Sequence, residues 1–352
     1  MNPMYIVVAI LAFGVIIAIH ELGHYLSAKA LNVKVNEFAI GMGPKLLSKQ
    51  GKETLYSLRA LPFGGFCSME GEHEEDDEPD PRSFLSQKRW RRVVILAAGS
   101  VANFIAAFII VFILTSGMPG FLSSTISEVT DSLPNEGPSE LMTGDRIVAL
   151  NGERVYYYDD FVLLLRVNAD KPIFFTIERD GEMIEYERRA YLVDGAWQFR
   201  YSINFEVIES NIWETLKFTG NQTYNFVRMI RLSIAMIIGG SAGIQDLAGP
   251  VGIVSAMNTI GQQAPTILDA VRGIVMFAAF IGVNVAVINL LPIPAMDGGR
   301  ILFTVVTWII EKITRRPLDP KYENYINTGA FILLLCLMVF VLYNDVMREF
   351  IR

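Results

Sequence analysis

The sequence predicts an α-helical polytopic membrane protein with four transmembrane helices, a membrane-associated β-hairpin and one inserted α+β domain. Three observations predict this class. Hydrophobic residues make up 52% of the 352-residue chain, and the mean hydropathy is +0.36. The apolar residues are concentrated in four blocks. The long segment between the second and third blocks has the alternation and the turns of short strands.

The four blocks are the candidate membrane spans, at residues 4–19, 93–115, 273–294 and 328–343. A helix crosses the hydrocarbon core of a bilayer with about 20 apolar residues, so the middle two blocks are long enough and the outer two are slightly short. The first block lacks a basic start and a small-residue cleavage site. We therefore expect it to stay in the mature protein rather than act as a removable signal peptide.

The basic residues next to the spans indicate the orientation of the chain. Two groups abut the spans: Lys88, Arg89, Arg91 and Arg92 before the second, and Arg300, Lys312, Arg315, Arg316 and Lys321 between the third and fourth. Because lysine and arginine accumulate on the cytoplasmic side, both groups should be cytoplasmic. Both termini and the segment 117–271 are then extracytoplasmic. The basic residues follow topology and form no patch that would bind nucleic acid.

Residues 117–206 form the predicted outer domain. Asp180-Gly181 is a strong hairpin turn between β-rich runs, and "YDDFVLLLRV" has the spacing of an amphipathic helix. "GDRIVALNG", residues 144–152, resembles the core signature of a PDZ domain. The alternative is a β-domain without affinity for peptides. The following segment, 207–271, contains an amphipathic helix that either lies on the membrane or packs as an ordinary helix.

The first span ends in His20-Glu21-Leu22-Gly23-His24, an H-E-x-x-H sequence. On a helix the two histidines share one face and can bind one Zn²⁺, with Glu21 beside them to act on water. The alternative is a pair of interior histidines whose hydrogen bonds are satisfied within the protein. The third histidine, His73, lies in an acidic run typical of a solvated loop.

A catalytic zinc site needs a third protein ligand, and Asp297 is the candidate. It is the only acidic residue between Asp269 and Glu311, and it follows Pro292 and Pro294, which break the third span. Irregular backbone at membrane depth is tolerated only where it is buried in protein or lines a cavity. The two cysteines, Cys67 and Cys336, suggest neither a disulfide nor a thiolate metal site.

The combination of HELGH with "NLLPIPAMDG", residues 289–298, resembles the site-2 protease family of intramembrane zinc metalloproteases, which carry H-E-x-x-H and N-x-x-P-x-P-x-x-D-G. Four further stretches resemble the bacterial branch that cleaves anti-sigma factors and carries an extracytoplasmic PDZ domain. They are "GMGPKL" at 41–46, "LPFGGFCSM" at 61–69, "GPVGI" at 249–253 and "LYNDVMREF" at 342–350. The resemblance covers the whole chain.

The resemblance implies that His20, His24 and Asp297 bind Zn²⁺ and that Glu21 is the catalytic base. Asn289 would bind the substrate backbone or the developing oxyanion; its alternative role is to satisfy a broken helix. A re-entrant hairpin at about 53–69 would hold the unwound substrate as an added strand, with Gly64, Gly65 and Phe66 in contact with it. Asn103 is a further candidate, although Ser100 stands where most family members have proline.

The implied function is zinc-dependent hydrolysis of single-span membrane proteins in the bacterial plasma membrane, close to its cytoplasmic side. Substrates would be anti-sigma factors after prior trimming or remnant signal peptides, and the outer domain would exclude untrimmed proteins. The expected parts are residues 1–116 and 272–352 as two halves of the membrane core, 117–206 as the outer domain and 207–271 as the helical linker. Two alternatives remain: a metal-ion transporter and a membrane scaffold that does not cleave.

Overall fold

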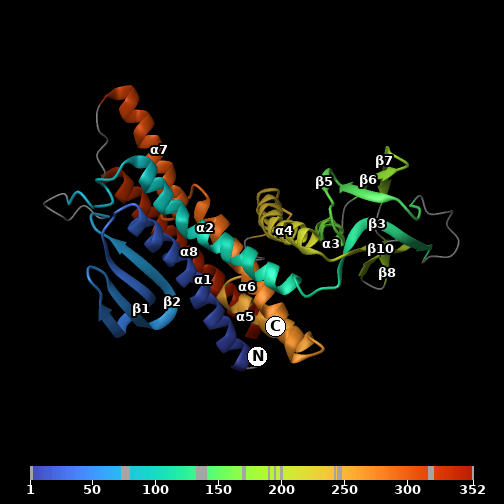
Figure 1. Cartoon of the computed structure of the whole chain (residues 1–352), viewed down its shortest axis with the longest axis horizontal. Helices are drawn as coiled ribbons and strands as arrows, with labels where there is room; N and C mark the ends of the chain where they lie inside the picture. The colour runs from blue at the N-terminus through green and yellow to red at the C-terminus, as the bar shows by residue number, and fades with distance from the viewer. Residues whose placement is uncertain are drawn as a thin grey trace. The chain divides into compact units, whose positions relative to one another are not determined.

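The computed structural model describes residues 3–72, 80–131, 141–168, 172–188, 191–193, 196–198, 201–241, 243, 248–315 and 321–350 (Figure 1). The chain divides into two compact units, which are described separately. The first unit comprises Met1–Ile110 and Met229–Arg352, and the second comprises Val111–Arg228.

The prediction of four membrane helices is confirmed. Within the described residues, four helices have sufficient length and hydropathy: α1 (Pro3–Ala30), α2 (Arg89–Thr115), α6 (Ile267–Leu290) and α8 (Lys321–Phe350). Their outward faces carry exposed large apolar side chains such as Leu11, Ile113 and Leu333, which in lipid cost nothing to expose. The chain is therefore a multi-pass membrane protein with additional β-structure.

Helix α1 packs against several other helices of the first unit. Ala9 and Ile16 of α1 share a core with α5 (Pro250–Gln263) and α6. A Cβ atom on Gly23 would lie 2.3 Å from the carbonyl oxygen of Ala98 on α2, so the two helices are in backbone contact there. Asp345 of α8 accepts a hydrogen bond from the Gly252 amide in the first turn of α5 at 2.9 Å, a favourable place for an anion.

A β-hairpin follows α1. Strands β1 (Val35–Gln50) and β2 (Leu55–Met69) pair antiparallel, with several register shifts. The base of the hairpin is buried against α1 and α2, and its outer half exposes apolar side chains of both strands, including Met42, Leu47 and Leu61. The hairpin is longer than the segment 53–69 expected from sequence, because β1 has no sustained apolar–polar alternation that would identify it as a strand. Gly64, with φ +86°, lies within β2 rather than in the turn.

The third predicted span is split by its prolines. Helix α6 ends at Leu290, two residues before Pro292, and a new helix, α7, begins at Asp297 and runs to Thr314. Proline disfavours helical backbone in the preceding residue, which explains where α6 stops. The intervening turn includes Ala295 at φ +69°, a left-handed conformation rarely adopted by a residue with a side chain.

The second unit is built on a six-stranded antiparallel sheet of order β10-β3-β4-β6-β7, in which β5 pairs with β4. The strands of this unit and their bounds are β3 (Gly120–Asp131), β4 (Arg146–Leu150), β5 (Glu153–Arg154), β6 (Ile173–Arg179), β7 (Glu182–Arg188), β8 (Tyr191–Val193), β9 (Ala196–Gln198) and β10 (Tyr201–Glu209). The short strands β8 and β9 pair with each other and, among the residues that the structure describes, with no other strand. The predicted hairpin turn is confirmed, since Asp180 and Gly181 join β6 to β7 with φ +53° and +84°.

Two helices accompany this sheet. The helix predicted from "YDDFVLLLRV" is confirmed as α3 (Tyr158–Val167), and the amphipathic segment that follows the sheet is helix α4 (Ile212–Ile238). Asp160 of α3 is fully buried and accepts hydrogen bonds from Asn221 of α4 at 3.0 and 3.1 Å. The two helices are thus joined by a buried polar contact.

Candidate metal centre

The two histidines of HELGH lie on one face of α1 and point to the same place. His20 and His24 are one turn apart, both are less than 10% exposed, and their Nε2 atoms are 3.2 Å apart. The aromatic rings are nearly perpendicular, with centroids separated by 4.8 Å. The helical i, i+4 spacing is sufficient to produce this arrangement.

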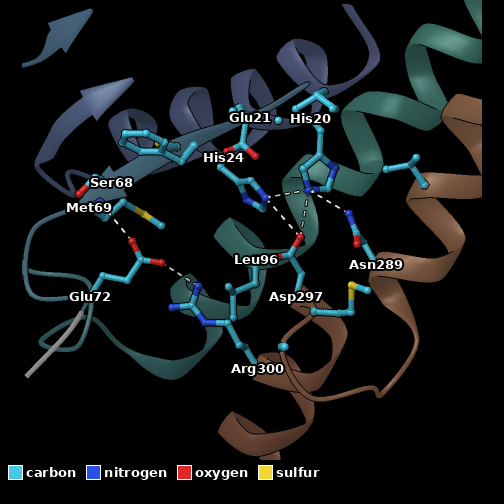
Figure 2. A pocket seen from close by; sticks show the side chains of 18 residues that line it. His20, Glu21, His24, Ser68, Met69, Glu72, Leu96, Asn289, Asp297 and Arg300 are labelled. Carbon is cyan, nitrogen blue, oxygen red and sulfur yellow. Dashed lines mark hydrogen bonds and ion pairs between the residues drawn. The ribbon is translucent and has the colours of Figure 1, made fainter. Parts of the chain in front are cut away.

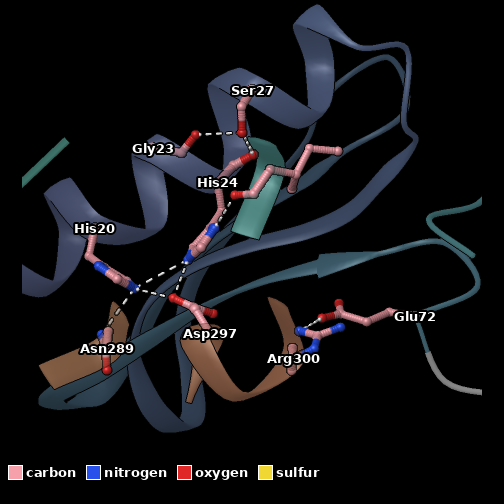
Figure 3. A network of polar contacts seen from close by, with 9 residues as sticks. His20, Gly23, His24, Ser27, Glu72, Asn289, Asp297 and Arg300 are labelled. Atoms are coloured by element: carbon pink, nitrogen blue, oxygen red, sulfur yellow. Dashed lines mark hydrogen bonds and ion pairs between the residues drawn. The ribbon is translucent and has the colours of Figure 1, made fainter. Parts of the chain in front are cut away.

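Asp297 reaches the histidine pair from the first turn of α7. Its Oδ2 atom is 3.2 Å from Nε2 of His20 and 3.3 Å from Nε2 of His24 (Figure 3). Ligand atoms of all three residues lie within 4.8 Å of one another. The structure therefore brings together the three residues that the sequence predicted as metal ligands.

The turn before Asp297 is tightly packed, and the two glycines after Asp297 make that packing possible. A Cβ atom on Gly298 would lie 2.2 Å from the carbonyl oxygen of Leu291, and one on Gly299 would lie 2.2 Å from that of Ile293. Any larger residue at either position would push α7 away from the turn. The Asp-Gly-Gly sequence thus sets the carboxylate at the start of α7, directly after the break in the membrane helix.

The histidine orientation suits a metal ion. Nδ1 of His24 lies 2.8 Å from the carbonyl oxygen of Ile95, so it donates a proton and leaves Nε2 with a lone pair toward His20 and Asp297. Gly99 keeps this space open, because its Cβ would lie 2.4 Å from Nε2 of His24. Two imidazoles and one carboxylate that converge in a buried site match the donor set of catalytic zinc, whose fourth position stays open.

Glu21 lines the cavity that contains these three residues. The cavity has a volume of about 560 Å³, and its wall on the hairpin side is formed by strand β2 (Figure 2). Gly64, Gly65 and Phe66 of β2 belong to this wall. A Cβ atom on Gly65 would come within 3.2 Å of Cγ of Glu21, so a glycine allows the strand to pass close to this carboxylate.

The two candidate asparagines differ in their relation to the cavity. Asn289, at the end of α6, lines it, and its Nδ2 atom lies 3.3 Å from Nε2 of His20. Asn103 of α2 is buried but is not among the described residues of the cavity wall. Its Nδ2 and the Ser100 hydroxyl have no hydrogen-bond partner within the described part of the chain.

Sequence reasoning missed two charged residues of the cavity, Glu72 and Arg300. They form an ion pair with 2.7 Å between Oε1 and Nη1. Glu72 belongs to the acidic run that is typical of a solvated loop. From sequence, Arg300 indicates only that its segment is cytoplasmic. His73, which belongs to the same run, lies outside the described residues. Burial raises the pKa of the Cys67 thiol, which also lines the cavity, so this thiol stays protonated and a poor metal ligand.

Comparison with known proteins places the chain in a family. The model of peptidase family M50 matches residues 8–337. A relative from Clostridium acetobutylicum, whose name assigns it provisionally to the zinc metalloproteases, is 34% identical over 98% of each chain. Zinc metalloprotease RasP of Geobacillus kaustophilus is 27% identical over 97% of each chain. The regulator of sigma-W protease RasP of Bacillus subtilis is 25% identical, with 98% of this chain and 99% of the relative covered.

The family match, the relatives and the four apolar helices agree with one another. With a buried His-His-Asp cluster beside a glutamate and a family match over nearly its whole length, the chain belongs to peptidase family M50, the site-2 proteases, and is a zinc metalloprotease of the bacterial membrane.

Proposed function

We propose that this protein hydrolyses peptide bonds within or next to single transmembrane helices, with Zn²⁺ held by His20, His24 and Asp297. The observation that carries the proposal is the meeting of these three side chains within 4.8 Å, with both histidines on α1, a helix long and apolar enough to span a membrane. A transporter would also place polar ligands at broken helices, but it has no need for a carboxylate such as Glu21 beside the ligands.

Glu21 is the proposed general base. Bound zinc would supply a Lewis acid that acidifies water and polarises the scissile carbonyl. Glu21 faces the same cavity, so it can take a proton from water and pass it to the leaving amide nitrogen. Asn289 provides a side-chain amide within reach of the cluster, able to donate to the substrate backbone or to the developing oxyanion.

Strand β2 is the proposed holder of the substrate. A transmembrane helix hides its amides in its own hydrogen bonds, so the segment to be cut must be extended, and addition to a strand edge keeps it so. The segment Gly64–Phe66 lines the cavity beside Glu21. An extended peptide along this part of β2 would pass the catalytic carboxylate with its backbone exposed.

The proposed substrates are anti-sigma factors after an earlier trimming cut, or remnant signal peptides. The name of the Bacillus subtilis relative, regulator of sigma-W protease RasP, supports the first. The sheet of the second unit, in which "GDRIVALNG" supplies β4 and helix α3 follows β5, supports a PDZ-like domain over residues 117–206. In the proposed topology this domain and both termini are extracytoplasmic, and the metal centre lies near the cytoplasmic side.

The deciding experiment compares wild type with Glu21→Gln in detergent micelles, using a labelled single-span helix without its outer domain. We expect the cleavage rate to fall 10²-fold or more while zinc content stays the same, because general acid–base groups contribute at that level. Glu182→Gln, which removes an exposed carboxylate in the second unit, should cleave as wild type does. Equal inactivity of all three proteins toward several helices that they still bind would favour the scaffold.

A further inference from the structure

We propose that the ion pair between Glu72 and Arg300 positions the metal ligand Asp297 relative to the strand that holds the substrate. The inference rests on the proposed function, because it assigns both residues a role in the same reaction. Neither residue touches the metal cluster directly in the contacts described, so each is a positioning residue. Figure 2 shows both residues, joined by their ion pair, on the wall of the cavity.

The pair joins two segments that are 228 residues apart in sequence. Arg300 lies in the first turn of α7, three residues after Asp297, and Glu72 follows the end of β2. Their side chains are only 26% and 14% exposed. Water screens such a pair less than one on an open surface, so its contribution should exceed that of an ordinary surface ion pair.

Arg300 and Glu72 each make a further contact that fixes the side chain in place. The Arg300 guanidinium lies 5.3 Å from the ring centroid of Phe84, which is 1% exposed. The second carboxylate oxygen of Glu72 accepts a hydrogen bond from the backbone amide of Met69, the last residue of β2, at 3.2 Å (Figure 2). The pair is therefore a fixed link between the end of β2 and the start of α7.

The start of α7 needs such a link. The turn before Asp297 contains Ala295 in a left-handed conformation, which costs free energy and persists only where neighbouring contacts hold it. One such contact is the hydrogen bond from the Ala295 amide to Oδ1 of Asn327 at 3.1 Å. The Glu72–Arg300 pair holds the other end of the segment, beyond Asp297.

The expected consequence concerns geometry at the reacting bond. Gly64–Phe66 of β2 would hold the substrate, and Asp297 holds the metal, so the pair keeps the substrate and the metal at a constant separation. A misplacement of about 1 Å can lower a reaction rate on the order of 10²-fold. A metal ligand with a looser backbone should also release its metal faster.

The test is a double-mutant cycle with Glu72→Gln, Arg300→Gln and the double variant, measured in the full-length protein in micelles. We expect each single variant to lower kcat about 10-fold to 10²-fold with a much smaller change in KM. Because the two residues act through one contact, the double variant should lose no more than the worse single variant. The rate of zinc release to a chelator should rise several-fold in all three.

Arg89→Gln is the matched control. Arg89 of α2 pairs with Glu311 near the other end of α7, so this variant removes an anchor of the same helix at a distance from Asp297. It should keep the wild-type kcat and zinc-release rate. Additive losses in the double variant, or zinc release at the wild-type rate in both single variants, would overturn the proposal. If the wild type cleaves no helix, the proposed function fails, and the zinc-release rates alone still decide whether the pair positions Asp297.

Discussion

Two clusters of buried polar residues, one in each unit, differ in the groups that surround their aspartate. In the second unit, the carboxylate of Asp160 accepts from the backbone amides of Tyr156 and Tyr157 and from the side-chain amides of Asn221 and Asn225. In the first unit, Nε2 of His24 and Oδ2 of Asp297 face each other across 3.3 Å, and Nδ1 of His24 donates to the carbonyl oxygen of Ile95. The Asp160 carboxylate is thus surrounded by amide donors, whereas the second cluster turns three atoms that can bind a metal toward one point.

A structural cluster and a metal site can both be buried and can both contain an aspartate. Burial alone does not distinguish them, since Asp160 is more deeply buried than Asp297. The hydrogen-bond donors around each aspartate do distinguish the two clusters. Asp160 has backbone amides and asparagine amides around it. The described contacts of the Asp297 carboxylate are with the imidazole nitrogens of His20 and His24 (Figure 3).

The largest effect should come from loss of a metal ligand. Asp297→Asn removes the only carboxylate among the three proposed zinc ligands. We therefore expect zinc content to fall to near zero and the cleavage rate to fall 10²-fold or more. Metal analysis of the purified protein checks the first outcome. Asp160→Asn is the matched variant in the other cluster and should retain its zinc. Full zinc content in Asp297→Asn would mean that another residue completes the site.

Removal of the structural carboxylate should act on stability rather than on metal. In Asp160→Ala the backbone amides of Tyr156 and Tyr157 lose their acceptor, and Arg228, which is 1% exposed, loses a charge partner 3.6 Å away. We expect the free energy of unfolding of the second unit to fall by about 3 kcal/mol. Pulse proteolysis of the full-length protein in urea measures this change. The exposed Glu182→Gln should stay within about 0.5 kcal/mol of wild type, and an equal loss in both variants would contradict the prediction.

A substitution between the metal cluster and the hairpin should lower activity without loss of zinc. In Gly65→Ala the new Cβ would lie 3.0 Å from the carbonyl oxygen of Ala39 and 3.2 Å from Cγ of Glu21. The strand must shift by a few tenths of an ångström, so we expect kcat/KM to fall about 10-fold. Cleavage assays together with metal analysis test this. A simultaneous loss of zinc would show that the hairpin supports the metal ligands as well.

The smallest effect concerns two glycines of the second unit. Gly181 has φ +84° in the β6–β7 turn, so Gly181→Ala should lower the free energy of unfolding by about 1 kcal/mol. Gly220 lies within α4 with open space around it, and Gly220→Ala should raise this free energy by up to about 1 kcal/mol. Urea unfolding of the two variants gives the sign of each change, and the same sign in both would contradict the argument.

Much of the architecture could be predicted from local sequence. The four spans follow from uninterrupted apolar runs, helix α3 from apolar spacing, and the β6–β7 turn from Asp180-Gly181, because each signal lies within about 20 consecutive residues. Strand β1 could not be predicted in this way. Its burial is irregular, and it becomes a strand through pairing with β2 rather than through its own pattern.

The sequence alone determined the chemical identity of the candidate site, because H-E-x-x-H places two imidazoles on one helical face and the proline-broken span leaves Asp297 as the available acid. Only the tertiary structure decided which other residues join it. Glu72 and Arg300 come from segments whose local patterns indicate a solvated loop and the cytoplasmic side of the membrane. They meet at the cavity because helix packing at Gly23 and the turn before Asp297 bring distant segments together, and contacts across 228 residues leave no local sequence signal.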